Sequence, residues 1–207
     1  MTPLQLARIV EWAGTLHSRK RLQKVVYLLQ TLRCPIEAEY TLHHYGPYSA
    51  DVARLTDQMT QAGLLIETAE PGPGGPQYSY RLSETSKAQI QALHERPGFQ
   101  DDILAFKEVT RRLLKYNPRE LEIASTVVYF RRQGDALDAA TEHTAAFKSI
   151  DPEGELMGRA LEIVGSLLQQ ICGGARRGLQ AVSRSALQLR QHRFVTRCFP
   201  ASTAGYA

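Results

Sequence analysis

The segment that most restricts the fold of this chain is residues 71–76, Pro-Gly-Pro-Gly-Gly-Pro. Prolines have no backbone N–H to donate and glycines favour irregular turns, so a helix cannot pass through this segment. It lies between LLIETA and QYSYRL, and the second of these alternates polar residues with Tyr78, Tyr80 and Leu82, as a strand does. The segment therefore predicts the irregular tip of a β-hairpin.

Three helices are predicted ahead of this hairpin. The first covers residues 3–13 and ends at Gly14. The second, RKRLQKVVYLLQ, follows Ser18 as its N-cap, and one of its faces is apolar: Leu22, Val25, Val26 and Leu29. After a short strand at 38–45, Gly46 and Pro47 are predicted to form a turn, and Ser49 to cap a third helix at about 50–62.

The order of these elements is helix, helix, short strand, helix, strand, Gly/Pro-rich tip, strand, and then a helix capped by Ser83. This order is typical of a winged helix-turn-helix, with the hairpin as the wing. We therefore expect an α+β fold, mainly α with a small β-hairpin, and a winged-helix-like domain over residues 1–96.

A helical region is predicted over residues 97–172, after the boundary at Pro97-Gly98. Its first helix is expected within 99–116. Asn117, Pro118 and Glu120 form a capping-box pattern for the second, Asp135 is the expected N-cap of the third, and Gly173-Gly174 the end of the last.

Charge separates the C-terminal residues from the rest. The sequence pI is about 9.0, but residues 173–207 contain six arginines and no acid, which leaves 19 basic against 21 acidic residues in the remainder. We expect 173–207 to be a basic, flexible tail, so the overall pI is no evidence that the folded part binds nucleic acid.

The remaining composition points to a cytoplasmic protein. The three cysteines, Cys34, Cys172 and Cys198, are too few and too far apart for a disulfide framework. The N-terminus lacks the layout of a signal peptide, and no apolar run approaches the length of about 18 residues that a membrane span needs.

Two motifs carry a family resemblance. Leu22-Gln23-Lys24 in the second helix, followed by Tyr45-Gly46-Pro47-Tyr48-Ser49, resembles the YwgA-like family of small bacterial proteins, over about residues 1–150. The same helix and Gly-Pro turn resemble, more distantly, the Panacea (SocA-like) antitoxin domain. The first resemblance implies a fold more than an activity, and the second implies an antitoxin or adaptor role.

The cluster His43-His44-Tyr45-Gly46-Pro47-Tyr48-Ser49 could be a metal site, a catalytic site or a structural turn. Adjacent histidines on a strand point to opposite faces and no further ligand stands at a suitable spacing, so a metal site is disfavoured. No nucleophile accompanies the histidines either. We favour a turn that is packed by Tyr45 and Tyr48, fixed by Pro47 with Gly46 as its flexible residue, and followed by the Ser49 cap.

The polar face of the 50–62 helix is the first candidate for DNA contact. Arg54 could pair with guanine, and Gln58 and Gln61 with adenine, in the major groove. Asp51 and Asp57 would repel phosphates, so a solvated face is the alternative. Ser49, at the start of this helix, is included in the predicted interface.

Four cations at the start of the second helix are the other candidate: Arg19, Lys20, Arg21 and Lys24. Positive charge at a helix N-terminus is unfavourable, so these side chains need a partner. The phosphate backbone of DNA is one partner, and carboxylates within the fold are the other.

The sequence thus predicts a non-enzymatic regulatory module that needs no cofactor or metal. Double-stranded DNA is the first expected partner. The alternative is a protein-binding adaptor or antitoxin of the Panacea type, and residues 97–172 are the expected surface for a homodimer. A positive face built from Arg19–Lys24, Arg54 and the wing would favour DNA, whereas an apolar or acidic surface there would favour a protein.

Overall fold

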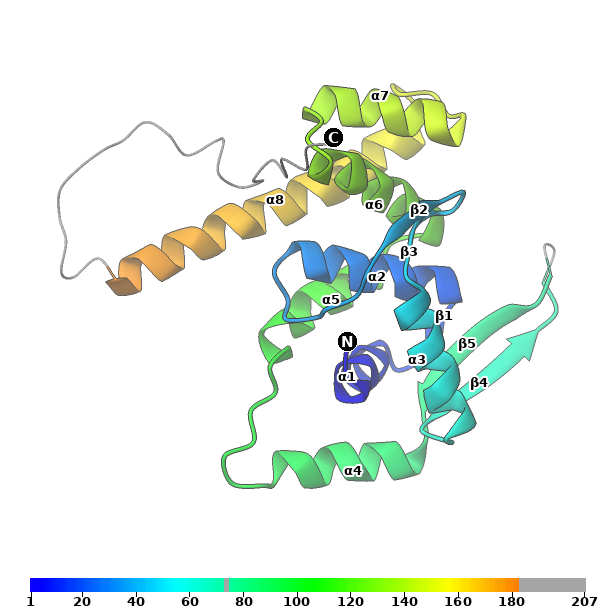
Figure 1. Cartoon of the computed structure of the whole chain (residues 1–207), viewed down its shortest axis with the longest axis vertical. Helices are drawn as coiled ribbons and strands as arrows, with labels where there is room; N and C mark the ends of the chain where they lie inside the picture. Colours follow the sequence, from blue (N-terminus) through cyan, green and yellow to red (C-terminus); the bar gives the residue numbers. More distant parts are fainter. Residues whose placement is uncertain (73–74, 183–207) are drawn as a thin grey trace, which may run out of the picture. The chain divides into compact units, whose positions relative to one another are not determined.

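A computed structural model describes residues 1–72 and 75–182, with side chains described as far as residue 169 (Figure 1). The contacts within the chain divide it into two compact units, Met1–Ser125 and Thr126–Ala207. The prediction of a mainly helical α+β chain with a small antiparallel sheet is confirmed. No helix in the part that the structure describes has both the length and the apolar character to cross a bilayer.

The first unit begins with α1 (Pro3–Ala13), β1 (Leu16–His17) and α2 (Arg19–Thr31). Thr2 caps α1 in a reciprocal capping box with Gln5. Ser18 occupies the expected N-cap position of α2, but its φ is +81° and its side chain makes no capping bond. The Ser18 N–H instead donates to the Tyr78 carbonyl at 2.7 Å, which continues the β1 ladder.

The turn expected at Gly46-Pro47 is also placed wrongly. Gly46–Tyr48 is strand β3, and it pairs with β2 (Thr41–His43) in a register that sets Pro47 opposite Leu42. The turn between the strands is His44-Tyr45. The helix that follows, α3 (Ala50–Gln61), matches its prediction, and the Ser49 hydroxyl accepts a bond from the Val52 N–H at 3.3 Å.

The predicted hairpin is confirmed as β4 (Leu65–Glu70) and β5 (Gln77–Leu82), which pair antiparallel from Leu65 opposite Leu82 to Glu70 opposite Gln77. The short β1 pairs with the other edge of β5, so the order in the sheet is β1-β5-β4. The predicted Ser83 cap of α4 (Glu84–His94) forms, since the Ser83 hydroxyl accepts from the Ser86 N–H at 3.2 Å.

The helix expected within 99–116 is broken into a 3-10 turn η1 (Leu104–Phe106) and α5 (Lys107–Leu113). The next helix, α6 (Pro118–Arg132), starts with the predicted capping box. Asn117 Oδ1 accepts from the Arg119 N–H at 2.8 Å, and Glu120 accepts from the Asn117 N–H at 3.0 Å.

Residues 97–125 belong to the first unit because side chains of α1 bind them. Arg8 donates to Asp101 at 2.6 Å, and Gln5 donates to Asp102 at 2.7 Å and to the Pro35 carbonyl at 2.8 Å. The contacts therefore extend this unit past the boundary that Pro97-Gly98 suggested.

The second unit contains α7 (Leu137–Lys148) and α8 (Glu155–Val182). Asp135 does not cap α7 as expected: Ala136 occupies that position, and the Asp135 carboxylate lies 2.7 Å from His143 Nδ1. The end expected at Gly173-Gly174 is wrong too, since α8 continues through both glycines. The rest of the predicted tail, 183–207, lies outside the described residues.

At the centre of the first unit, α2 is buried on every side from Leu22 to Leu29. This stretch includes the polar Gln23 and Lys24, which contact the segment before α3. The two family motifs therefore meet in the core.

Candidate interaction surface

Gln23 and Lys24 tie α2 to the start of α3 through the backbone. The Gln23 amide donates to the Ser49 carbonyl and accepts from the Ser49 N–H, both at 2.9 Å. Lys24 Nζ donates to the Pro47 carbonyl at 2.6 Å. These bonds explain why the Leu22-Gln23-Lys24 and Tyr45–Ser49 motifs occur together, because the side chains of one motif satisfy buried backbone groups of the other.

Two residues of the predicted DNA interface are therefore not placed to contact a duplex. Lys24 is only 2% exposed, and Ser49 is fully buried. A phosphate cannot approach a charge that the core encloses. Lys24 therefore cannot share one anion with the exposed Lys20.

Arg19 is the most heavily bonded of the predicted cations. Its guanidinium donates to Tyr80 at 2.5 Å and to Glu67 at 2.8 Å, and lies 3.5 Å from Asp57. It also lies over the Tyr78 ring, 4.5 Å from its centroid. Burial opposes its charge, but the bonds to Glu67 and Tyr80 raise the pKa of Arg19 overall. Of the two partners considered for this cation, phosphate or a carboxylate within the fold, Arg19 has carboxylates within the fold.

The pairing of strands, which local sequence patterns do not reveal, brings these partners to Arg19. The alternation of Tyr78 and Tyr80 predicts a strand, but it does not predict that Glu67 of β4 lies opposite Tyr80. In the β4–β5 pair, Glu67 lies directly opposite Tyr80. Both side chains therefore lie on the same face of the sheet, where Arg19 binds them.

Arg21 and Lys20 point to different surroundings. Arg21 is half-buried and donates to the Tyr116 carbonyl at 3.2 Å, and burial lowers its pKa. Lys20 is exposed, and its ammonium lies 3.4 Å from the centroid of the Tyr45 ring. Tyr45 is itself 51% exposed, so it does not pack the turn as expected. Tyr48 is half-buried and packs on His43, with ring centroids 4.9 Å apart.

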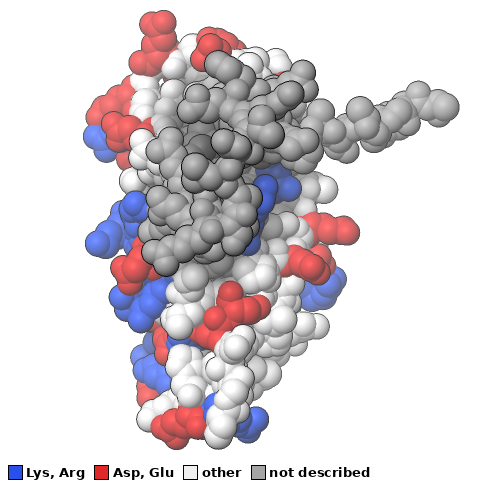
Figure 2. All heavy atoms as spheres, turned by 90° about the vertical axis from the view of Figure 1, so that its left-hand side faces the viewer, with Lys and Arg blue, Asp and Glu red and all other residues white. Residues whose placement is uncertain are grey.

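The outer face of α3 presents the polar residues that the sequence placed there. Arg54, Gln58 and Gln61 are all exposed. Arg54 is bound by Asp51 at 2.7 Å, one turn earlier on the same helix. On the face shown in Figure 2, the visible Lys and Arg side chains of the described residues are mixed with Asp and Glu.

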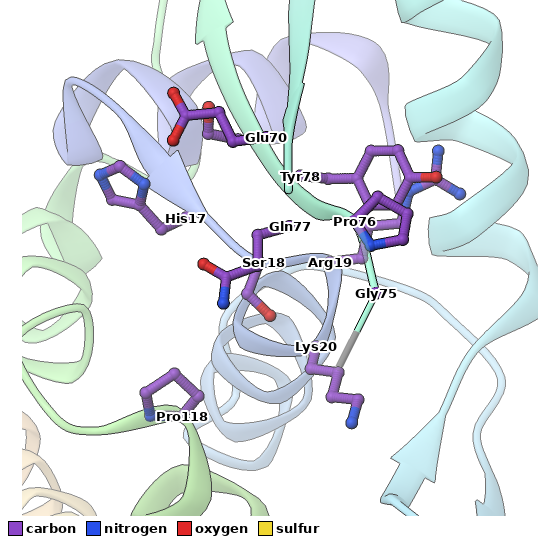
Figure 3. Close-up of a pocket in the computed structure, with 11 residues that line it drawn as sticks. His17, Ser18, Arg19, Lys20, Glu70, Gly75, Pro76, Gln77, Tyr78 and Pro118 are labelled. Atoms are coloured by element: carbon purple, nitrogen blue, oxygen red, sulfur yellow. The ribbon is translucent and has the colours of Figure 1, made fainter. Parts of the chain in front are cut away.

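A hollow of about 530 Å³ lies between the start of α2 and the β4–β5 hairpin. Figure 3 shows His17, Ser18, Arg19 and Lys20 contributing from one side, the strand residues Glu70, Gln77 and Tyr78 from the other, and Pro118 across from them. The hollow thus mixes the cations Arg19 and Lys20 with the Glu70 carboxylate and the Gln77 amide.

The histidines of the HHYGPYS segment do not converge. His43 packs on Tyr48, whereas the His44 ring lies 5.1 Å from that of Tyr45. Among residues 1–72 and 75–182, no group of three or more His, Cys, Asp or Glu side chains is arranged to hold a metal ion.

Comparison with known proteins gives one relevant relative. No family model matches the chain. The uncharacterized protein YwgA of Bacillus subtilis (strain 168) is 31% identical over 126 residues, which are 61% of this chain and 72% of YwgA. The matched length and identity support the resemblance that the two motifs indicated. The chain therefore belongs to the YwgA-like family.

Proposed function

We propose that the protein is a non-enzymatic binding module that uses α3 and the β4–β5 hairpin to contact a protein partner. The observation that carries this proposal is that three of the predicted DNA-binding cations are paired with carboxylates or enclosed within the fold. Arg19 is bound to Glu67, Arg54 is bound to Asp51, and Lys24 is buried. DNA affinity depends on cations that replace the counterions of phosphates, and paired cations supply little of that energy.

The order of elements supports the choice of this surface. The three-stranded sheet has the order β1-β5-β4, and α2 and α3 lie between β1 and β4 along the chain. This arrangement is expected of a winged helix-turn-helix. In such a fold the third helix and the hairpin form the exposed recognition surface. Here that surface carries Gln58, Gln61 and charges of both signs, and exposed side-chain amides can both donate and accept hydrogen bonds from a protein partner.

DNA binding remains the competing function, because Gln58, Gln61 and Arg54 are exposed on α3. If DNA is the partner, Arg54 must leave Asp51 to reach a base. The likeness to the Panacea antitoxin domain stays a prediction, and it would add only that the partner is a toxin or an adaptor target.

Photocrosslinking tests the proposal. A photoreactive benzoyl-phenylalanine replaces Gln58 on α3, and Gln89, exposed on α4, is the matched control. We expect a discrete protein adduct from position 58 in cells and none from position 89. A nucleic-acid adduct at 58 would refute the protein assignment.

Duplex binding by the full chain gives an independent test. Arg54→Ala and Lys20→Ala are compared with the parent, so that the arginines of 173–207 contribute equally to all three proteins. We expect affinity and salt dependence to be unchanged. A loss of about tenfold with Arg54→Ala, or a salt slope lower by about one unit with Lys20→Ala, would establish DNA contact instead.

A further inference from the structure

Strand β4 has a free edge, and this edge is part of the β4–β5 hairpin. β4 is the last strand in the order β1-β5-β4, so one of its edges carries no strand in the described sheet. In an antiparallel pair, successive residues point their backbone N–H and C=O groups alternately toward the partner strand and away from it. The phase of this alternation decides which residues of β4 offer backbone groups to a further strand.

Two hydrogen bonds set this phase independently. The Ser83 N–H donates to the Leu64 carbonyl at 3.1 Å, so the even-numbered residues of β4 bond to β5. On the other side of β5, the Ser18 N–H donates to the Tyr78 carbonyl at 2.7 Å, so the backbone of Tyr78 faces β1. The backbone of Ala69, which lies opposite Tyr78 on β4, therefore faces outward.

The outward groups of β4 differ in whether another chain can reach them. Leu65 is only 2% exposed, so the fold covers its backbone. Glu67 is half-buried and Ala69 is exposed. Among residues 1–72 and 75–182, no backbone group bonds to Glu67 or Ala69 on this side. Such a row of free N–H and C=O groups is a template on which a further strand can pair.

The side chains beside this edge define one face of the sheet. Side chains alternate along a strand, so Ile66, Thr68 and Glu70 share a face, and all three are exposed. Ile66 is 37% exposed, a large value for an apolar side chain. An added strand would therefore meet an apolar, a β-branched and an acidic side chain in that order.

A second copy of β4 is a poor occupant of the edge. Two copies paired through Glu67 and Ala69 would form only a short ladder. They would also bring Glu67 and Glu70 of each copy together, and β4 supplies no cation to balance them. Stable protein interfaces bury about 1,200–2,000 Å², more than such a ladder provides. A partner that also covers α3 supplies further area, and it can supply the cation.

We propose that the protein partner adds an extended segment to β4 as an antiparallel strand, an inference that rests on the proposed function. Backbone bonds to Glu67 and Ala69 give affinity, and side chains at alternate positions give specificity. From its N-terminal end, the segment places a basic residue beside Glu70, a β-branched residue beside Thr68 and an apolar residue beside Ile66. Cross-strand pairs of these kinds stabilise a sheet.

Amide hydrogen exchange of the full chain, measured by nuclear magnetic resonance, tests the edge directly. In the free chain, we expect slow exchange at Ile66 and Thr68, which bond to β5, and fast exchange at Glu67 and Ala69. The probe is the peptide acetyl-Lys-Thr-Val-Thr-Val-amide. At saturation it should slow exchange at Glu67 and Ala69 about tenfold or more. A peptide with Glu in place of Lys should bind about tenfold more weakly.

Three outcomes of this measurement overturn the inference. The first is unchanged exchange at Glu67 and Ala69 with the lysine peptide, and the second is equal affinity for the two peptides. The third is slow exchange at Glu67 and Ala69 in the free chain, because the edge is then already occupied. If that slow exchange depends on protein concentration, the occupant is a second copy of the chain.

A proline variant tests the edge against the natural partner in cells. Ala69→Pro removes an outward N–H and no bond to β5, and proline is tolerated at such edge positions. Ala69→Val keeps the N–H and is the matched control. Both changes are combined with benzoyl-phenylalanine at Gln58, and thermal melts confirm that the proteins fold. We expect the protein adduct from position 58 to persist with Ala69→Val and to be lost with Ala69→Pro.

The two proposals fail in different ways. An adduct that persists with Ala69→Pro overturns the added strand, while the proposed contact through α3 stands. No adduct from position 58 in the parent refutes the proposed function, whereas slowed exchange at Glu67 and Ala69 with the lysine peptide would still establish the edge.

Discussion

Replacing Gln23 with leucine should lower the free energy of unfolding by more than the loss of one hydrogen bond would. Gln23 is buried and makes two bonds of 2.9 Å with the Ser49 backbone. The Ser49 carbonyl keeps its bond from the Ala53 N–H at 3.2 Å, but the Ser49 N–H loses its acceptor. A lost bond costs about 1 kcal/mol, and an enclosed unpaired N–H costs about 1–3 kcal/mol more. We expect a loss of about 2–4 kcal/mol.

Urea unfolding followed by Trp12 fluorescence measures this loss. Two matched variants separate its causes. Ser49→Ala removes the cap but leaves both Gln23 bonds, so it should cost about 1 kcal/mol. Gln61→Leu changes an exposed glutamine on α3 and should cost less than about 0.5 kcal/mol. If Gln23→Leu is no more destabilising than Gln61→Leu, the reciprocal bond does not hold the two motifs together.

Three further outcomes are expected. Lys24→Met removes the bond to the Pro47 carbonyl, so a urea titration should show a loss of about 1–3 kcal/mol, and a wild-type midpoint would contradict the buried role. Burial favours the neutral form of Glu67, but bonds with Tyr80 and Arg19 lower its pKa below the ordinary 4.5. Its stabilisation is therefore complete above pH 4.5 and lost as the pH falls through the lowered pKa. Melts of Glu67→Gln should lack that part of the acid dependence, and an unchanged profile would contradict it. Burial, with Asp102 and Asp101, raises the pKa of Cys34 to about 12, so mass spectrometry should find Cys34 alkylated at pH 8 in urea but not in the native protein.

Features that depend on residues close together in the chain, such as helix caps and the hairpin tip, are predictable from the sequence. Ser49, Ser83 and Asn117 cap helices as expected, because a capping bond joins residues only two or three positions apart. The hairpin around 71–76 was predictable for the same reason, since no regular element tolerates that composition.

The failures share a different cause, which is competition from distant partners. Ser18 occupies the predicted N-cap position, but its side chain makes no capping bond and its N–H binds the Tyr78 carbonyl. The sequence predicts an exposed Lys24, but its ammonium group is buried and donates to the carbonyl of Pro47, 23 positions further along the chain. Asp135 fits a cap, but it binds His143 instead. A single sequence does not reveal such pairs until the strands and helices have been placed.

The charge of the candidate surface was the least predictable feature. The sequence predicts a positive patch from four cations, Arg19, Lys20, Arg21 and Lys24. A count of charges does not include the burial of Lys24 or the pairing of Arg19 with Glu67 of β4. Asp51 and Asp57 are visible in the sequence, and in the structure Asp51 lies 2.7 Å from Arg54 and Asp57 lies 3.5 Å from Arg19.

The bonds between Gln23 and Ser49 hold α2 directly to the start of α3. Gln23 and Lys24 bind Ser49 and Pro47 at the end of the connecting segment, and none of these bonds involves the tip of the β2–β3 hairpin. The tip of the β2–β3 hairpin, His44-Tyr45, is exposed. Evolution or engineering can therefore lengthen that tip, and even insert a short foreign epitope there, while the surface of α3 keeps its orientation.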